Sequence, residues 1–356
     1  MAFEIVRNDI TKMTVDAIVN TANPMVAVGA GVDEAIYRAA GMEELLAERK
    51  KIGPMQPGDV AVTPAFGLDA KYIIHAVGPA WEGGTRGEAE TVASCYRRSL
   101  AKAKELQCES IAFPLLSSGT YGFPKDVALK TAVSEISGFL FENEMTVYLV
   151  VYDKKSFEVS GKAFRDIQIL IDEKDIRISE ASLTYGRTGS FKNTVVGPIS
   201  SLHMFGRPVG AEDIDLDEGE TFVEELQYVG AHQKKDLEDA LKYKEETFQE
   251  YLFRLIDKKG LDDVTVYKKA NIDRKHFSKI KGDTNYNPSK RTAVAFALAL
   301  DLNLDETRDL LLRAGIALSN SNAFDIIIRY CIEHHITDIM EINCILFKYE
   351  QPTLGA

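Results

Sequence analysis

The stretch Val15–Gly41, VDAIVNTANPMVAVGAGVDEAIYRAAG, decides the fold of the first part of this chain. It begins with a β-branched apolar run and continues into the polar turn 20–24, NTANP. A loop with glycines at 29 and 31 follows, and then an Ala-rich segment with helical spacing that stops at Gly41. Glycines let a backbone approach a ligand closely, and a helix N-terminus offers free N–H groups. This order of strand, turn, loop and helix predicts a site for a phosphate or a nucleotide.

Strands and helices alternate around this stretch from residue 1 to about 165. We expect strands at 3–6, 15–20, 72–77, 110–115 and 146–152, and helices at 32–50, 88–106 and 125–142. The run 146–152 is apolar almost throughout, as in a strand with both sheet faces covered. The alternation predicts a layered α/β domain.

A second motif is the stretch 113–124, FPLLSSGTYGFP, in which a predicted strand ends in Ser-Ser-Gly and a helix begins after Pro124. Gly119 and Gly122 free the backbone, so that consecutive N–H groups can surround a pyrophosphate. Tyr121 and Phe123 offer flat apolar surface to a ribose. The motif therefore predicts a diphosphate-binding loop.

The two motifs together resemble the macrodomain family, the ADP-ribose-binding module. N-x-A-N at 20–23, followed ten residues later by Asp33 of G-x-G-V-D, resembles the branch that removes ADP-ribose or O-acetyl groups. Residues 117–124 resemble the family's diphosphate loop, S-[ST]-G-x-[FY]-G-[FY]-P, at every position. The resemblance implies a three-layer α/β/α fold with a mixed sheet. It implies no cofactor or metal, because 20–41 lacks the Cys and His ligands of the zinc-dependent branch.

The resemblance also implies a role for individual residues. Asn23 would hydrogen-bond the ribose next to the scissile bond, and Asp33 would position or activate a water. Asp9 would accept a hydrogen bond from the adenine amine, and Tyr152 would stack on the adenine. His75 is interpreted as a structural histidine with satisfied hydrogen bonds. Catalytic residues would be Asn23 and Asp33, and the ligand-binding set would be Asp9, Ile10, Asn23, Gly29, Gly31, Val32, Ser117, Ser118, Gly119, Thr120, Tyr121, Gly122, Phe123 and Tyr152.

The implied activity is that of an ADP-ribosyl hydrolase or an O-acetyl-ADP-ribose deacetylase. Such an enzyme binds ADP-ribose and hydrolyses ADP-ribosyl linkages on modified macromolecules or the ester of O-acetyl-ADP-ribose. The family's loop usually reads Gly-Gly-Gly-Val-Asp, and here Ala30 replaces the middle glycine, which leaves the substrate class open. The alternative is a non-enzymatic ADP-ribose sensor or reader that regulates a DNA-bound or protein partner through the C-terminal region.

Composition sets further limits on partners and compartment. The formal net charge of −12 over 356 residues argues against general coating of a polyanion, but it allows a local basic patch. Four scattered cysteines without a C-x-x-C pair predict a reduced, cytoplasmic setting. Without an apolar run of about 20 residues, no membrane association is expected. Eight acidic and no basic residues between 212 and 225 predict an acidic, partly ordered linker at 166–235, after a macrodomain at 1–165.

Residues 236–356 read as an all-α domain. We expect helices near 264–270, 274–281, 288–301, 305–313, 323–334 and 336–347, after an amphipathic stripe over 237–255. Eight Lys and Arg against two acids in 264–291 give a local excess of positive charge. The stretch 268–280 resembles a Cro/repressor-type helix-turn-helix with Ala270, Ile272, Phe277 and Ile280 inward. The resemblance suggests nucleic-acid contacts by Arg274, Lys275, Lys279 and Lys281, and the alternative is a protein-interaction domain with a solvated basic face.

Overall fold

The computed structural model describes residues 2–152 and 246–355. Residues 2–152 and 247–355 belong to one compact unit. The predicted acidic linker and the first part of the amphipathic stripe lie outside the described residues. The boundaries at 165 and 235 therefore stay predictions.

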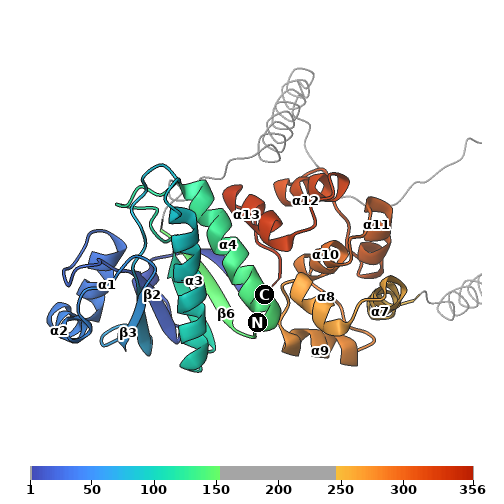
Figure 1. The fold of residues 1–356 in the computed structure, drawn as a ribbon. Helices are drawn as coiled ribbons and strands as arrows, with labels where there is room; N and C mark the ends of the chain where they lie inside the picture. Colours follow the sequence, from blue (N-terminus) through green and yellow to red (C-terminus); the bar gives the residue numbers. More distant parts are fainter. Residues whose placement is uncertain (1, 153–245, 356) are drawn as a thin grey trace, which may run out of the picture. The chain divides into compact units, whose positions relative to one another are not determined.

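A six-stranded mixed sheet forms the centre of the N-terminal part (Figure 1). Its strands are β1 (Ala2–Arg7), β2 (Ala17–Thr21), β3 (Val60–Pro64), β4 (Tyr72–Ala76), β5 (Ser110–Pro114) and β6 (Thr146–Val151). The order across the sheet is β1-β6-β5-β2-β4-β3, and β3 alone runs antiparallel to its neighbour. The predicted mixed sheet is confirmed.

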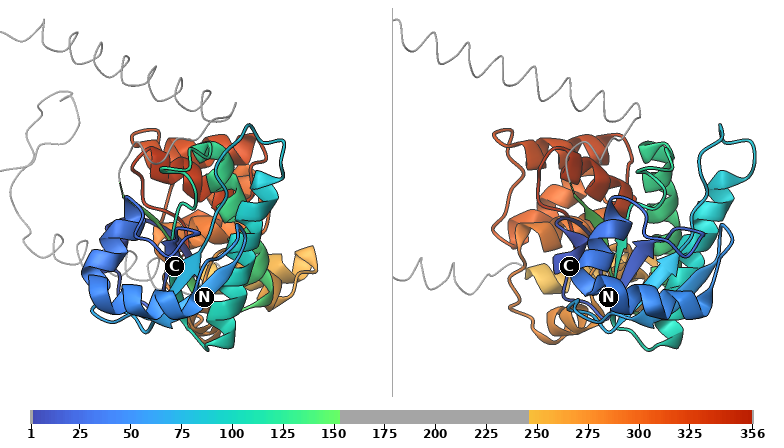
Figure 2. Two further views of the ribbon diagram at one scale, coloured as in Figure 1. Left: turned by 60° about the vertical axis from the view of Figure 1, so that its left-hand side comes forward. Right: turned by 90° about the vertical axis from the view of Figure 1, so that its left-hand side faces the viewer.

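Helices cover both faces of this sheet. α1 (Val32–Ala40) and α2 (Met42–Ile52) share a core with Ile18, whereas α3 (Glu88–Glu105) and α4 (Lys125–Glu142) share one with its neighbours Ala17 and Val19. Side chains alternate between the faces of a strand, so an apolar strand such as β2 serves both layers. Figures 1 and 2 show α3 and α4 side by side. The predicted three-layer α/β/α fold is confirmed.

Two local predictions in this part need correction. The segment predicted as one helix at 32–50 is broken at Gly41, whose φ of +112° ends α1 and precedes α2. Only glycine adopts such a backbone readily, and its N–H still bonds to the Tyr37 carbonyl at 3.1 Å. Strand β3 was not among the predicted strands. A short 3₁₀ helix, η1 (Ile10–Lys12), follows β1.

The described C-terminal residues are helical, as predicted. They form α7 (Phe248–Lys259), α8 (Asp263–Lys269), α9 (Arg274–Gly282), α10 (Lys290–Ala299), α11 (Leu304–Arg313), α12 (Ala323–Glu333) and α13 (Ile339–Lys348). Side-chain caps fix most starts, and Thr247 and Asn303 form full capping boxes with the glutamates three residues on. Across the two described ranges, every helix is too short or too polar to cross a bilayer.

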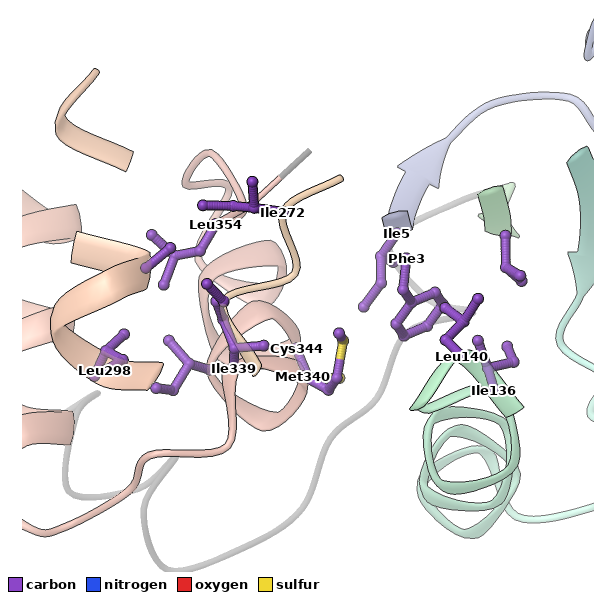
Figure 3. Close-up of a cluster of buried hydrophobic side chains, with 14 of the residues drawn as sticks. Phe3, Ile5, Ile136, Leu140, Ile272, Leu298, Ile339, Met340, Cys344 and Leu354 are labelled. Atoms are coloured by element: carbon purple, nitrogen blue, oxygen red, sulfur yellow. The ribbon is translucent and has the colours of Figure 1, made fainter. Parts of the chain in front are cut away.

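The C-terminal helices share a hydrophobic core with strand β1 and helix α4. Figure 3 shows Met340 of α13 between the side chains of the two regions. Asn271, in the turn between α8 and α9, bonds to both backbone groups of Phe3: its Oδ1 accepts from the Phe3 N–H and its Nδ2 donates to the Phe3 carbonyl, each at 2.9 Å. The side-chain amide of Asn271 thus pairs with the edge of β1 at Phe3.

Candidate active site at the carboxyl ends of the strands

A pocket of about 310 Å³ opens where three strands of the sheet end. Thr21 at the end of β2, Pro114 at the end of β5 and Val151 at the end of β6 line it. Ligands of open α/β sheets bind in the crevice outside the carboxyl ends of the strands, because loops and helix N-termini converge there. This pocket is therefore the candidate active site.

Most of the predicted ligand-binding residues line this pocket. They are Asn23, Gly29, Gly31, Val32, Ser117, Ser118, Gly119, Thr120, Tyr121 and Tyr152, and Asp33, predicted as catalytic, lines the pocket as well. Ala30, Leu115 and Val150 also line it and were not in the predicted set. The structure thus brings together the two motifs, which are about 90 residues apart in sequence.

Four predicted ligand residues do not line the pocket: Asp9, Ile10, Gly122 and Phe123. The side chain of Asp9 caps η1 by accepting from the Thr11 N–H at 3.0 Å and the Thr11 hydroxyl at 2.7 Å, both through Oδ1. Phe123 is only 2% exposed and packs edge-on against Trp81, with ring centroids 4.8 Å apart. The ring of Phe123 therefore packs inside the protein and is not exposed for contact with a ribose.

Asp33 is the most constrained polar side chain of the pocket. It lies in the first turn of α1 and is 2% exposed. Its Oδ1 accepts from Asn20 Nδ2 at 2.6 Å, and its Oδ2 accepts from the Gly29 N–H at 2.5 Å. Burial raises the pKa of Asp33, against the opposing effects of these two hydrogen bonds and of the Arg49 charge. The carboxylate is held in one orientation at the pocket wall.

Asn23 lies in a turn that its own side chain stabilises by a hydrogen bond. Its Oδ1 accepts from the Met25 N–H at 2.9 Å, which leaves the Nδ2 hydrogens for other acceptors. Behind the turn, the guanidinium of Arg49 donates to the carbonyls of Gly53 and Asn23. Arg49 is 1% exposed and has no ion-pair partner among the described residues. Sequence analysis did not identify this buried cation.

The loop after β5 is shaped for an anion. Ser117 has a φ of +60°, and the loop closes through bonds from Gly122 N–H to the Gly119 carbonyl (2.9 Å) and from Phe123 N–H to the Ser117 carbonyl (3.1 Å). Within the described chain, the N–H groups of residues 119–121 have no acceptor. Consecutive free N–H groups in a turn form a concave anion site.

His75 has satisfied hydrogen bonds, as predicted for it. It is fully buried on β4, and its two ring nitrogens lie 3.2 Å from Asn20 Nδ2 and 3.0 Å from Thr63 Oγ1. Burial, with a smaller effect from Arg49, lowers the pKa of His75 to about 3. The ring is therefore neutral at physiological pH.

The residues predicted for nucleic-acid contact lie together on α9. Arg274, Lys275, Lys279 and Lys281 are all exposed, and Lys281 forms an ion pair with Asp263 at 2.5 Å. The four apolar residues predicted to face inward are at most 3% exposed: Ala270, Ile272, Phe277 and Ile280. A helix, a short turn and a second helix with basic exposed positions are therefore present.

Comparison with known proteins decides the family. The family model of the Macro domain matches residues 19–132. A macro domain-containing protein of Methanosarcina mazei is 50% identical over 165 residues, which are 46% of this chain and 88% of that protein. The chain belongs to the macrodomain family.

Two further similarities concern the same macrodomain. An O-acetyl-ADP-ribose deacetylase of Enterobacter sp. (strain 638) is 43% identical over 161 residues, covering 44% of this chain and 89% of that protein. A solved structure of the Oceanobacillus iheyensis macrodomain with ADP is 38% identical, covers 43% of this chain and 85% of that one, and has a TM-score of 0.42. Each covers less than half of this chain.

Proposed function

We propose that this macrodomain binds ADP-ribose and hydrolyses a bond to its distal ribose. The bond is either the ester of O-acetyl-ADP-ribose or an ADP-ribosyl linkage on a modified macromolecule. The observation that carries the proposal is the Asp33 carboxylate, held by Gly29 and Asn20 in the wall of a pocket that Asn23 also lines. The name of the Enterobacter relative, at 43% identity, favours the ester.

The pocket offers complementary chemistry to each part of this ligand. The free N–H groups of residues 119–121 and the start of α1 suit the two phosphates. Tyr152 is 73% exposed at the pocket edge and provides a ring for adenine stacking. Asp9, just beyond β1, keeps Oδ2 free of bonds within the described residues, and we assign this oxygen to the adenine amine although Asp9 does not line the pocket.

In the proposed reaction, Asn23 donates from Nδ2 to a ribose hydroxyl and so fixes the sugar beside Asp33. Asp33 orients a water and takes up its proton as the water oxygen bonds to the acetyl carbon. The acyl–oxygen bond to the ribose then breaks, and the ribose oxygen receives the proton. The products are acetate and ADP-ribose. For a glycosidic substrate the same water attacks the anomeric carbon, the bond from that carbon to the macromolecule breaks, and the leaving group receives the proton from Asp33.

The test compares wild-type turnover of O-acetyl-ADP-ribose with that of mono-ADP-ribosylated protein, beside calorimetry with ADP-ribose. Turnover of either substrate, inhibited by ADP-ribose, supports the proposal and identifies the bond. Tight ADP-ribose binding without turnover of both substrates would replace the hydrolase with a sensor. Absence of ADP-ribose binding would contradict both.

Gly78→Ala is expected to weaken ADP-ribose binding at least about fivefold, because the added methyl overpacks the anion loop at a cost of about 1–3 kcal/mol. A Cβ at Gly78 would stand 1.9 Å from Ser117 Oγ, so Ser117 must move. Calorimetry with ADP-ribose measures the effect. The control is Gly138→Ala, which adds the same methyl to α4 where no atom lies within 4 Å, and it should leave the affinity unchanged. Equal affinities for the two variants would contradict the role of this loop.

A second candidate function is regulation of a DNA-bound partner, and the exposed cations of α9 favour it. Lys275 and Lys279 lie one helical turn apart, and neither forms an ion pair with a described residue. Exposed cations on one helix face suit the phosphates of a duplex. In this function, ADP-ribose binds to the macrodomain as the regulatory signal, and α9 contacts the DNA.

Lys275→Glu/Lys279→Glu is expected to weaken duplex DNA binding by at least about tenfold. It should also reduce the slope of log affinity against log salt concentration by about two, since each lost phosphate contact lowers that slope by about one. Titration of a labelled duplex at several salt concentrations measures both quantities. The control is Lys50→Glu/Lys51→Glu on α2, which makes the same charge change elsewhere. If both variants weaken binding equally, the effect is net charge and not α9. If wild-type protein binds no duplex, a protein partner becomes the better candidate.

A further inference from the structure

A line of four buried polar side chains crosses the apolar sheet and ends at the candidate active site. Thr63 on β3, His75 on β4, Asn20 on β2 and Asp33 on α1 are each at most 2% exposed. Burial of a polar group costs free energy unless it is hydrogen-bonded, and these side chains bond to one another, although Asn20 Oδ1 has no partner among the described residues. We call these four side chains the polar line.

The strand register places these side chains next to one another. Asn20 pairs directly with His75 in the parallel β2–β4 ladder. In the antiparallel β3–β4 ladder, Ala61 pairs with His75, and Thr63 lies two residues further along the same face. Diagonal neighbours of this kind are within reach of a long side chain. The line is therefore a product of register and not of sequence proximity.

The donors and acceptors of the polar line determine where its protons lie. The Nδ2 group of Asn20 has two hydrogens, and it contacts Asp33 Oδ1 at 2.6 Å and His75 Nδ1 at 3.2 Å. His75 Nδ1 must then accept, so the neutral ring carries its proton on Nε2. That proton is donated to Thr63 Oγ1 at 3.0 Å. The Thr63 hydroxyl thus accepts from His75 in this tautomer, and the lone pair on Nδ1 favours the amide orientation in which Asn20 Nδ2 faces the ring.

We propose that His75 is a positioning residue for the hydrolysis: its Nε2–H tautomer holds the Asn20 amide so that Nδ2 faces the Asp33 carboxylate. This rests on the proposed function. If the amide turned over, the Asn20 oxygen would face Asp33 Oδ1, and two acceptors would meet without a hydrogen between them. Asp33 would then keep only its bond from Gly29 and could rotate away from the water it must orient.

The test compares His75→Leu with His75→Asn. Leu removes both ring nitrogens, whereas Asn keeps an oxygen near the position of Nδ1 that can accept from Asn20. His75→Leu is expected to lower kcat by about 10–100-fold, because a small misplacement of a catalytic group has effects of this size. The Kd for ADP-ribose should stay within about threefold, since the phosphate and adenine contacts are untouched. His75→Asn should recover most of the lost kcat.

A purely structural role for His75 predicts another pattern, in which kcat, ADP-ribose affinity and melting temperature fall together and Asn rescues none of them. That pattern, or a wild-type kcat in His75→Leu, would overturn the proposal. If His75→Leu does not fold, Thr63→Val takes its place: it removes the hydroxyl at nearly constant volume and should lower kcat by about 2–10-fold at unchanged Kd. Unchanged kcat in Thr63→Val would then overturn the proposal.

A readout independent of turnover separates this proposal from the proposed function. Nitrogen-15 NMR of the wild-type imidazoles reports the tautomer of His75 directly, and Nε2–H is expected. An Nδ1–H tautomer overturns the proposal even if the enzyme is active. Nε2–H without turnover of either substrate means that the polar line exists while the hydrolase function, and the positioning role with it, is wrong.

Discussion

Asp33→Asn is expected to lower kcat by about 10²–10⁴-fold while changing the Kd for ADP-ribose less than about threefold, because it removes a general base and little of the binding surface. An amide cannot take up the proton of the attacking water. It also cannot accept from both donors that now hold the carboxylate, because its NH₂ group would face either Gly29 N–H or Asn20 Nδ2. Steady-state kinetics and ADP-ribose calorimetry on the same preparation measure both effects.

Asp9→Asn is the matched control, since it makes the same chemical change at the other carboxylate assigned to the ligand. It is expected to raise KM and the ADP-ribose Kd with little change in kcat, because adenine binding is remote from the reacting bond. Asp33→Asn should therefore lower kcat with little change in ligand affinity, whereas Asp9→Asn should raise KM with little change in kcat. Comparable losses of kcat in both would show that Asp33 is not the base.

The pH dependence of kcat gives an independent check on Asp33. Burial raises the pKa of this carboxyl above 3.8, and it must be ionised to accept a proton. Activity is therefore expected to fall as the pH drops through the raised pKa, so the midpoint of the acid limb lies above pH 3.8. The pKa of His75 is lowered to about 3, so its ring titrates below this limb. Residual activity of Asp33→Asn should lack this limb.

The two pocket loops could be predicted from the sequence because their chemistry is local. Gly29, Asp33 and the loop 117–121 belong to short motifs in which spacing alone determines which backbone groups can meet a ligand. The polar line could not be predicted in this way. Asn20 is part of a motif, but its partner His75 is 55 residues away and is brought to it by strand register.

Arg49 shows a different limit of sequence analysis. It lies in the basic last turn of α2, where exposed Lys50 and Lys51 follow it, and an arginine there is ordinarily a solvated surface residue. Its burial follows from packing of that turn against the Asn23 loop, which no local pattern encodes. The break at Gly41 is different, since the sequence shows that the Ala-rich segment stops there, and the backbone shows that α2 follows as a separate helix.

Helices in the C-terminal region could be placed to within a few residues because their starts carry side-chain caps. Asp273, Ser289 and Asn322 each accept from an N–H of the first turn, and each follows a turn or loop in sequence. The contact of Asn271 with Phe3 could not be predicted, because it joins residues 268 apart. Local signals thus determine the elements, and long-range contacts determine which polar residues become buried.

Lys290→Met is expected to lower the free energy of unfolding by about 3–5 kcal/mol, because it leaves a buried carboxylate without its counter-charge. Asp325, in the first turn of α12, is fully buried, and its Oδ2 accepts from Lys290 Nζ at 2.7 Å. The Ser319 N–H (2.7 Å) and Asn322 Nδ2 (3.0 Å) bind the same oxygen. These neutral donors remain in the variant, but they cannot replace the positive charge. Chemical denaturation followed by circular dichroism measures the loss.

Arg38→Met is the control, because it breaks an ion pair of the same 2.7 Å length on the surface of α1, where Arg38 and Glu34 side chains are 75% and 47% exposed. Exposed pairs contribute about 0–1 kcal/mol, so this variant should unfold nearly as the wild type does. The contrast between the two variants isolates burial as the cause. A similar small loss in both would mean that the Asp325 carboxylate is stabilised sufficiently by Ser319 and Asn322, and that Lys290 contributes no more than a surface charge does.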